Sequence, residues 1–218
     1  MIGMLRRLCL PAFGAAAILL SGGCNILGII PAKSNNEDVP AQYVPAKDSM
    51  LVLAESYGAA PSADIDSQYV GFALTRDLKD HEIAPTVDPK VLMQLRDSNG
   101  DEYNKMTIDG IGRAAGAKQV LYVQITYADV EHPTGSDQAR GIMTARVRIV
   151  DSDTGETRWP AGSRTGSVVQ IQTEWTRTAS DQAKIRTKMA DQLADAVGKL
   201  FRTYTPDHLN DVSKVAEQ

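Results

Sequence analysis

Three histidines, His81, His132 and His208, are the side chains best suited to bind a metal or to transfer protons near neutral pH. Each lies alone among acids or turn residues. None has a second ligand type at the i,i+4 spacing that places two side chains on one helix face. We therefore expect exposed polar histidines and no metal site.

Nucleophile motifs are also missing from the sequence. No serine lies in a G-x-S-x-G pattern, and no cysteine follows Cys24. The glycines Gly110, Gly112 and Gly116 lack dinucleotide-loop spacing, and they close an expected helix instead of opening one after a strand. We expect them to permit close helix–sheet packing, with Gly116 as a left-handed helix cap. No bound cofactor is expected.

Acidic residues offer the remaining catalytic chemistry. Asp64 and Asp66 form one pair and Asp151 and Asp153 another, both among turn-forming residues. The run 97–101 has some features of a calcium loop, but its ligand pattern stops too early. We expect these acids to cap turns. A glycan hydrolase would need two carboxylates facing one cleft, which the sequence neither places nor forbids.

Arginines and tryptophans form the candidate partner surface. Arg146, Arg148, Trp159 and Trp175 all fall on expected strands. Such aromatic residues most often pack in a core or on a sheet face. Exposed together with the arginines, they would instead form a contact surface for a protein partner. Both interpretations stay open from the sequence.

The N-terminus carries a targeting signal. Arg6 and Arg7 precede an uncharged apolar run, 8–20, which is shorter than the roughly 20 residues of a membrane-spanning helix. Small residues then lead to Cys24. This segment resembles the lipobox of bacterial lipoproteins, which implies a signal peptide over 1–23, cleavage between Gly23 and Cys24, and acyl chains such as palmitate on Cys24. Asn25 lacks the aspartate of an inner-membrane retention signal, which favours the outer membrane.

The cysteine content and the net charge are consistent with this expected localisation. Cys9 and Cys24 are the two cysteines of the chain, so the remainder forms no disulfide. Acyl chains anchor a protein by about 0.8 kcal/mol per buried CH₂. The net charge of −4, without a basic block, argues against nucleic-acid binding.

The mature chain has three expected parts: a lipidated, flexible tether over 24–48, a globular domain over 49–204 and a flexible tail over 205–218. Prolines and polar residues dominate the tether. Hydrophobic periodicity within the domain predicts the order β-α-β-α-α-β-β-β-α. The expected strands are 50–54, 83–87, 119–127, 141–151 and the antiparallel stretch 158–159 with 167–175; the expected helices are 67–78, one beginning at 88–89, 107–115 and one from 180 to about 201. This order predicts a single α+β domain whose mixed, mainly antiparallel sheet is covered by helices on one face.

Two short motifs carry a family resemblance. Ala114–Ala117 precedes a strand, and Val150–Gly155 ends another strand shortly before Trp159. With the element order, this pattern resembles periplasmic domains related to the N-terminal domain of TolB and to CsgG. The resemblance implies a non-enzymatic binding or assembly module of the cell envelope.

We therefore expect a lipid-anchored periplasmic module that binds an envelope protein through a sheet face or edge. A self-assembling ring or secretion accessory is one alternative, and an Asp/Glu glycan hydrolase is another. Pore formation is disfavoured because membrane hairpins need strands of about 9–11 residues. The segment 128–139 reads as a short polar loop, and glycines and Pro160 interrupt 157–175.

Overall fold

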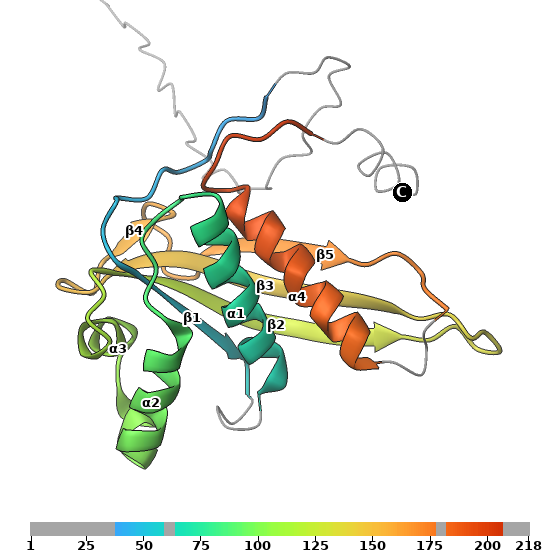
Figure 1. Cartoon of the computed structure of the whole chain (residues 1–218), viewed down its shortest axis with the longest axis horizontal. Coiled ribbons are helices and arrows are strands. Elements are labelled where there is room, and N and C mark those ends of the chain that lie inside the picture. Colours follow the sequence, from blue (N-terminus) through green and yellow to red (C-terminus); the bar gives the residue numbers. More distant parts are fainter. Residues whose placement is uncertain (1–37, 59–63, 178–181, 207–218) are drawn as a thin grey trace, which may run out of the picture. The chain divides into compact units, whose positions relative to one another are not determined.

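The computed structural model describes residues 38–58, 64–177 and 182–206, all within one compact unit, Asn35–Gln218 (Figure 1). The signal peptide, Cys24, Ser180 and His208 lie outside the described residues. The elements are β1 Met50–Ser56, α1 Ile65–Asp80, α2 Pro89–Asn99, the 3₁₀ helix η1 Gly100–Lys105, α3 Ile108–Ala114, β2 Gln119–Glu131, β3 Arg140–Asp151, β4 Thr157–Trp159, β5 Ser167–Gln172 and α4 Gln182–Gly198. The expected single α+β domain is confirmed.

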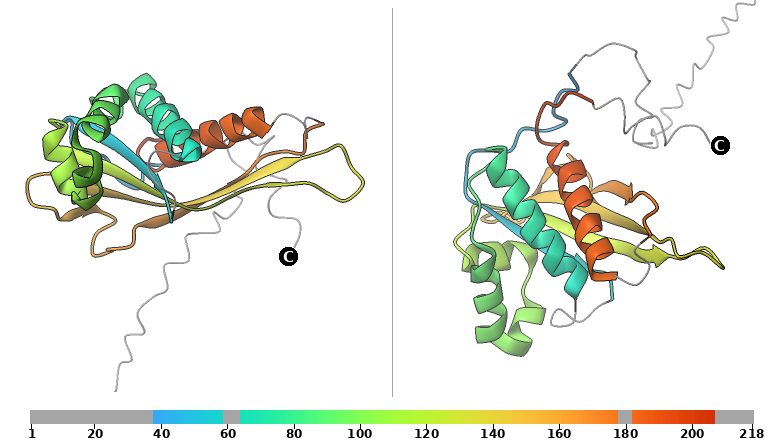
Figure 2. Two further views of the ribbon diagram at one scale, coloured as in Figure 1. Left: turned by 90° about the horizontal axis from the view of Figure 1, so that it is seen from below. Right: turned by 45° about the vertical axis from the view of Figure 1, so that its right-hand side comes forward.

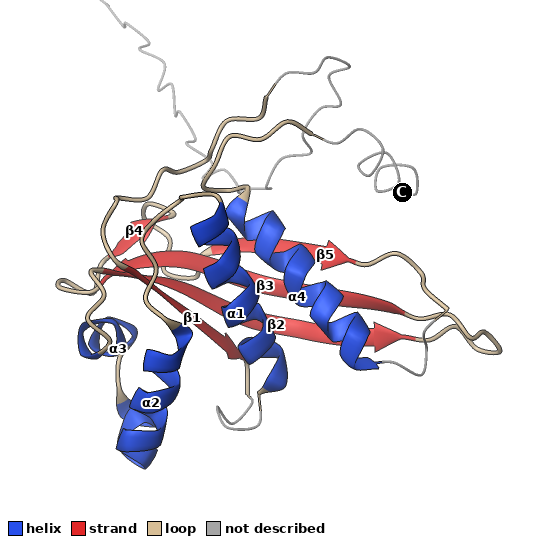
Figure 3. Ribbon diagram, viewed as in Figure 1, coloured by secondary structure: helices blue, strands red, loops and turns tan. Residues whose placement is uncertain are grey.

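The sheet is mixed and mostly antiparallel, as expected (Figure 3). Strand β1 runs parallel to β2, which pairs antiparallel with β3. Both β4 and β5 pair antiparallel with β3, β4 near its C-terminal end and β5 along Ile142–Val147. Three α-helices and the 3₁₀ helix η1 separate β1 from β2, because parallel neighbours require a long crossover connection.

Helices α1 and α4 lie side by side over one face of the sheet (Figure 2). The four-residue steps predicted for α4 are present, because Ile185, Met189, Leu193 and Val197 are all buried. They pack with Val70, Leu74 and Leu78 of α1 and with Met50, Val52, Val123, Val147 and Ile149 of the sheet. Burying each such side chain contributes about 1.5–3 kcal/mol, so this layer is the main core.

The remaining helical segment covers part of the opposite face, which corrects the expectation of helices on one face. Leu51 and Leu53 of β1 point away from α1 and α4 because side chains alternate along a strand. They form a second cluster with Leu92, Tyr103, Ile111, Ala117 and Val120. Segment α2–η1–α3 therefore shields β1 and the start of β2, and no other described element covers this face of β3 and β5.

Side-chain caps begin three helices. Asp88 caps α2 with Pro89 as its first residue, as predicted, and Thr107 caps α3. Helix α1 starts at Ile65, two residues before the expected start, because Asp64 is its cap: the Asp64 carboxylate accepts the Ser67 backbone N–H at 3.0 Å. The predicted turn-capping role is thus confirmed for Asp64.

Asp66 makes a different contact from the one expected. Its carboxylate forms an ion pair with Arg186 of α4 and so joins α1 to α4.

Two other local predictions are confirmed. The Asp151 Oδ1 accepts the backbone N–H groups of Asp153 and Thr154 at 2.8 and 2.9 Å, and Gly155 has a φ of 75°. Gly116 follows α3 with a φ of 73°.

The stretch 83–87 does not form the expected second strand. Only an isolated bridge joins Met50 to Thr86, with backbone hydrogen bonds from Met50 N to Pro85 O at 2.7 Å and from Val87 N to Met50 O at 2.9 Å. Pro85 has no N–H to extend a ladder.

Strands β2 and β3 are longer than predicted. Residues 128–131, expected in a loop, belong to β2, and β3 begins at Arg140. At the same end of the sheet, β5 ends at Gln172, so Trp175 lies beyond the strand. The expectation of a short polar loop over 128–139 was therefore wrong for its first residues.

Residues 38–48, expected in the flexible tether, are packed on the domain. Val39 pairs with Tyr204 through hydrogen bonds of 2.8 and 3.0 Å, and Gln42 N donates to Leu200 O at 2.8 Å. The Gln119 side-chain amide donates to the backbone oxygens of Ala46 and Asp48. The folded part therefore includes residues 38–48, and the domain boundary expected at residue 49 was placed too late.

Candidate interaction surface

The uncovered side of the sheet carries the two arginines singled out from the sequence. Along β3, buried and partly exposed residues alternate over almost the whole strand. Val147 and Ile149 point to the main core, so Arg146 and Arg148 point to the opposite side. The alternation predicted for this strand is confirmed, and it presents both guanidinium groups on one face.

The strand register brings uncharged side chains beside these arginines. Arg146 lies opposite Gln124 of β2 and Val168 of β5, and Arg148 lies opposite Tyr122 of β2. Directly opposed residues share a face of the sheet. We call Tyr122, Gln124, Arg146, Arg148, Val168 and Gln170 the basic sheet face; its most apolar member, Val168, is 46% exposed.

Arg148 and Tyr122 orient one another. The Arg148 guanidinium lies 5.1 Å from the centre of the Tyr122 ring and donates to the backbone oxygen of Arg164 at 2.7 Å. The Tyr122 hydroxyl donates to the Glu55 carboxylate at 3.2 Å. Burial first, and then the charge of Glu55, raise the pKa of Tyr122 to about 12, so this hydroxyl remains a donor at neutral pH.

The positive charge of this face is unbalanced. Among the described residues, neither Arg146 nor Arg148 forms an ion pair with a carboxylate, whereas Arg140, Arg158, Arg186 and Arg202 all do. Glu55 lies opposite Gln124 on the same side of the sheet, but it forms no ion pair with either arginine. Two guanidinium groups without an ion pair suit an acidic binding partner.

Trp159 does not belong to this surface, which corrects the sequence-based candidate set. It is buried at 8% exposure, stacked edge-on against Phe201 with ring centres 5.3 Å apart and near Tyr43 at 6.4 Å. Its partners come from opposite ends of the described chain, so no local pattern could place it. The packing interpretation holds for Trp159.

Trp175 is exposed, but it lies away from the arginine pair. Its side chain is 40% exposed, and the Arg140 guanidinium lies 4.4 Å from its ring centre. Arg140 occupies the far end of β3 and pairs with Glu131 at 2.7 Å. Alternation places Arg140 on the same side of the sheet as Arg146, so Trp175 extends this side toward the β2–β3 turn.

Four members of the basic sheet face, Tyr122, Gln124, Val168 and Gln170, were not among the candidates predicted from the sequence. Tyr122 and Gln124 were recognised as one alternating set of β2, but their neighbours depend on strand register. Val168 carries no signal of its own. An exposed valine opposite an arginine becomes apparent only when β5 is paired with β3.

Potential metal ligands do not gather into a site within the described part of the chain. No group of three or more His, Cys, Asp or Glu side chains there could hold a metal ion. His81 lies 3.2 Å from Asp77 at the end of α1, and His132 is exposed in the β2–β3 turn. No helix in these residues has the length and apolar character needed to cross a membrane.

Comparisons with known proteins concern the fold. No protein-family model matches the chain, and no curated protein matches it by sequence. The lipoprotein GNA1162 from Neisseria meningitidis is 18% identical, with 67% of this chain and 98% of that chain covered at a TM-score of 0.43. A PelC dodecamer from Paraburkholderia phytofirmans is 14% identical, with 75% and 94% covered at a TM-score of 0.40.

A third similar structure is the LpoB C-terminal domain from Salmonella enterica. It is 16% identical, with 62% of this chain and 87% of that chain covered at a TM-score of 0.35. All three TM-scores lie below 0.5, so no functional property of this chain follows from them. The expected relation to TolB and CsgG stays a prediction.

Proposed function

We propose that this chain is a lipid-anchored lipoprotein of the bacterial cell envelope that binds an acidic protein partner through the basic sheet face. The partner belongs to the same compartment, on the periplasmic side of the outer membrane. The protein acts as a binding or assembly module and not as an enzyme.

The observation that carries this proposal is the position of Arg146 and Arg148, which form no ion pair among the described residues, on a face of the sheet that no described helix covers. Arg140 and Arg186 each form an ion pair with a carboxylate of the same domain. A domain that binds no partner could pair Arg146 and Arg148 in the same way at little cost in stability. Arg148 is also held in place by Tyr122 and by the Arg164 backbone. A pre-oriented guanidinium loses less side-chain entropy on binding, which favours affinity.

The anchor supports the proposed compartment. Small residues before Cys24 and the short apolar run before them are features of a lipoprotein signal. Residues 38–43 lie against 200–204, so the anchored end of the chain reaches the domain at the end of α4. The basic sheet face lies on the side of the sheet opposite α4, so the segment that leads to the anchor does not cover it within the described residues.

Site-specific photo-crosslinking in living bacteria tests the proposal. A photoreactive amino acid replaces Gln170, on the basic sheet face, or Thr187, exposed on α4, in the full chain. We expect the Gln170 position to capture one envelope protein whose contacting segment is acidic. The double variant Arg146→Glu, Arg148→Glu should abolish this product, whereas Arg76→Glu on α1 should leave it unchanged.

Two results would contradict the proposal. One is a crosslinked product at Thr187 but none at Gln170. The other is a Gln170 product that joins two copies of this chain, which would favour the self-assembling alternative. Mass spectrometry of the mature N-terminus provides the separate test of the anchor: an unmodified Cys24 thiol would exclude lipidation.

A further inference from the structure

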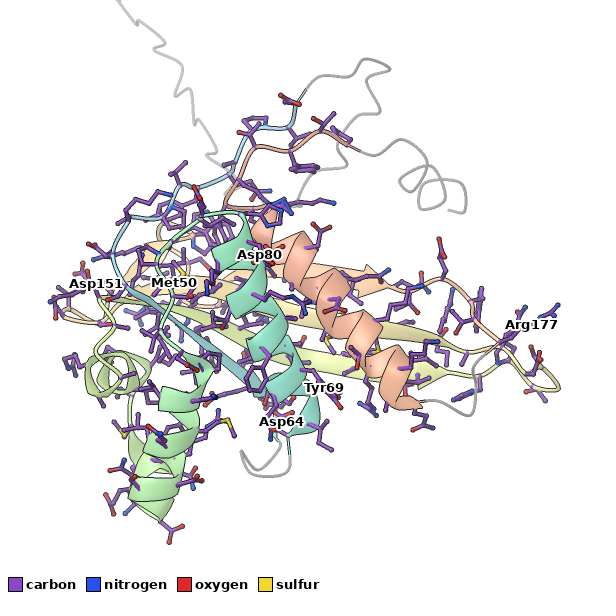
Figure 4. The ribbon with its side chains drawn as sticks, in the orientation of Figure 1. Met50, Asp64, Tyr69, Asp80, Asp151 and Arg177 are labelled. Atoms are coloured by element: carbon purple, nitrogen blue, oxygen red, sulfur yellow. The ribbon has the colours of Figure 1, made fainter. Side chains whose placement is uncertain are left out.

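A small polar cavity lies where β1 ends and α1 begins, remote in sequence from the basic sheet face. Its volume is about 200 Å³. The end of β1, the start of α1 and the α2–η1–α3 segment all line it. Figure 4 labels Asp64 at the start of α1, beside this cavity. We propose that it binds a small zwitterion of the α-amino-acid class.

Tyr103 provides the first indication of a ligand. This residue is 3% exposed and lines the cavity, and its hydroxyl lies beside the Arg96 side chain but makes no hydrogen bond of good geometry within the described residues. A buried hydroxyl without a partner is unfavourable and therefore rare in folded proteins. Burial raises the pKa of Tyr103, so the group is a neutral donor at physiological pH. A ligand oxygen would satisfy it.

Arg96 provides a positive charge at the same place. Its guanidinium lies 5.3 Å from the centre of the Tyr103 ring, and its buried Nε has no hydrogen-bond partner among the residues that the structure describes. Within the described ranges it forms no ion pair with a carboxylate. The planar guanidinium and the Tyr103 hydroxyl are donors suited to a carboxylate, and Asn104 also lines the cavity.

One of the two acids in the cavity is already occupied. Asp64 accepts the Ser56 N–H at 2.6 Å, the Ser56 hydroxyl at 2.7 Å and the Ser67 N–H at 3.0 Å. Burial acts to raise the pKa of Asp64, but these hydrogen bonds outweigh it and hold the pKa below its ordinary value. Asp64 is therefore an ionised structural group that fixes the wall of the cavity.

Glu55 is the acid available to a ligand. Its Oε2 accepts the Tyr122 hydroxyl at 3.2 Å, and its other oxygen has no hydrogen bond within the described structure. A carboxylate at one part of the cavity and a guanidinium at another match an ammonium and a carboxylate carried by one molecule. Met106 and Ile111 add apolar surface for a small side chain.

The size of the cavity limits the ligand. Sites for drug-sized molecules measure about 300–1,000 Å³, so a cavity below that range fits a smaller molecule. A simple anion would leave Glu55 unpaired beside it, and a simple cation would leave Arg96 unpaired. A molecule with both charges pairs both, which is why the zwitterion is preferred.

Ligand-observed saturation-transfer NMR and calorimetry on the full chain in detergent test this site. The probes are L-alanine and D-alanine, with acetate and methylammonium as half-ligand controls. We expect at least one alanine enantiomer to bind measurably more tightly than either half-ligand. Binding should persist in the single variant Arg146→Glu, which leaves the Arg148–Tyr122–Glu55 contacts in place, so failure of the proposed partner surface and failure of this site are distinguishable.

Three variants assign the roles within the cavity. Tyr103→Phe removes only the hydroxyl and should weaken alanine binding about tenfold, the effect of one hydrogen bond to a charged group. Arg96→Gln should abolish binding, and Glu55→Gln should weaken alanine while leaving any acetate binding unchanged or stronger. Arg164→Gln, an exposed arginine outside the cavity, is the matched control.

The proposal is overturned if neither alanine binds more tightly than acetate and methylammonium. It is equally overturned if Tyr103→Phe, with an unchanged melting temperature, binds alanine as the parent does. If Arg96→Gln does not fold, the conservative Tyr103→Phe and Glu55→Gln variants still decide the question.

Discussion

Arg158 of β4 forms an ion pair with Asp151 at the end of β3, with Nη2 and Oδ2 2.5 Å apart. The other Asp151 oxygen caps its own turn by accepting the N–H groups of Asp153 and Thr154. The Thr154 backbone hydrogen bond first, and then the Arg158 guanidinium, lower the pKa of Asp151 from 3.8 to about 2. The Asp151 carboxylate thus stabilises both the turn after β3 and the contact between β3 and β4.

Acid should weaken the fold through this group. The pKa of this carboxyl is lower in the folded protein than in the unfolded chain, so the ionised carboxylate stabilises the fold fully at pH values above the unfolded pKa. This contribution to stability is lost as the pH falls from about 4 toward 2. We expect the free energy of unfolding of the parent to fall more steeply over that range than that of Asp151→Asn. At pH 7 the variant should be about 1 kcal/mol less stable. Urea unfolding followed by circular dichroism measures both, and parallel pH profiles would contradict the assignment.

Gly112 lies where α3 approaches the sheet. A Cβ added there would collide with the side chains of Val120 and Ser152. Gly112→Ala should therefore lower the free energy of unfolding by about 1–3 kcal/mol. Gly71→Ala on α1 is the matched control: its Cβ would have no neighbour within 4 Å, so it should stabilise the helix by about 0.5–1 kcal/mol. Equal effects in thermal melts would disprove the close-packing role.

The unpartnered hydroxyl of Tyr103 should be dispensable for folding. Tyr103→Phe keeps the ring and removes a buried hydroxyl that has no partner of good geometry among the described residues. In the absence of ligand, the free energy of unfolding should therefore stay unchanged or rise by about 1 kcal/mol. Tyr122→Phe instead breaks the hydrogen bond to Glu55 and should cost about 0.5–1.5 kcal/mol. Urea titrations compare the two. A strongly destabilised Tyr103→Phe would mean that the hydroxyl has a structural partner.

The packed segment 38–48 should contribute to stability. Tyr43 is partly buried beside Trp159, whereas its neighbour Val44 is 71% exposed. Tyr43→Ala should lower the free energy of unfolding by about 1–2 kcal/mol, and Val44→Ala should change it by less than about 0.5 kcal/mol. Differential scanning calorimetry of the two full-length variants makes the comparison. Identical melting temperatures would restore the view that this segment is only a tether.

Local chemistry in the sequence was enough to predict much of the fold. The Asp88 cap with Pro89, the Asp151 turn, the Gly116 left-handed cap and the four-residue steps of α4 all involve residues within a few positions of one another. The same holds for the alternation of β3, which placed Arg146 and Arg148 on one side of a strand. The composition and the Cys24 motif likewise led to the prediction of a lipid anchor in the cell envelope.

The tertiary structure decided what those residues face. Trp159 entered the core because Tyr43 and Phe201, far away in the chain, meet its ring. Register between strands placed Gln124 and Val168 beside Arg146. The Arg96–Tyr103 cavity forms where β1, α1 and η1 meet. Contacts between distant segments depend on the packing of whole elements, and no short window of sequence encodes that packing.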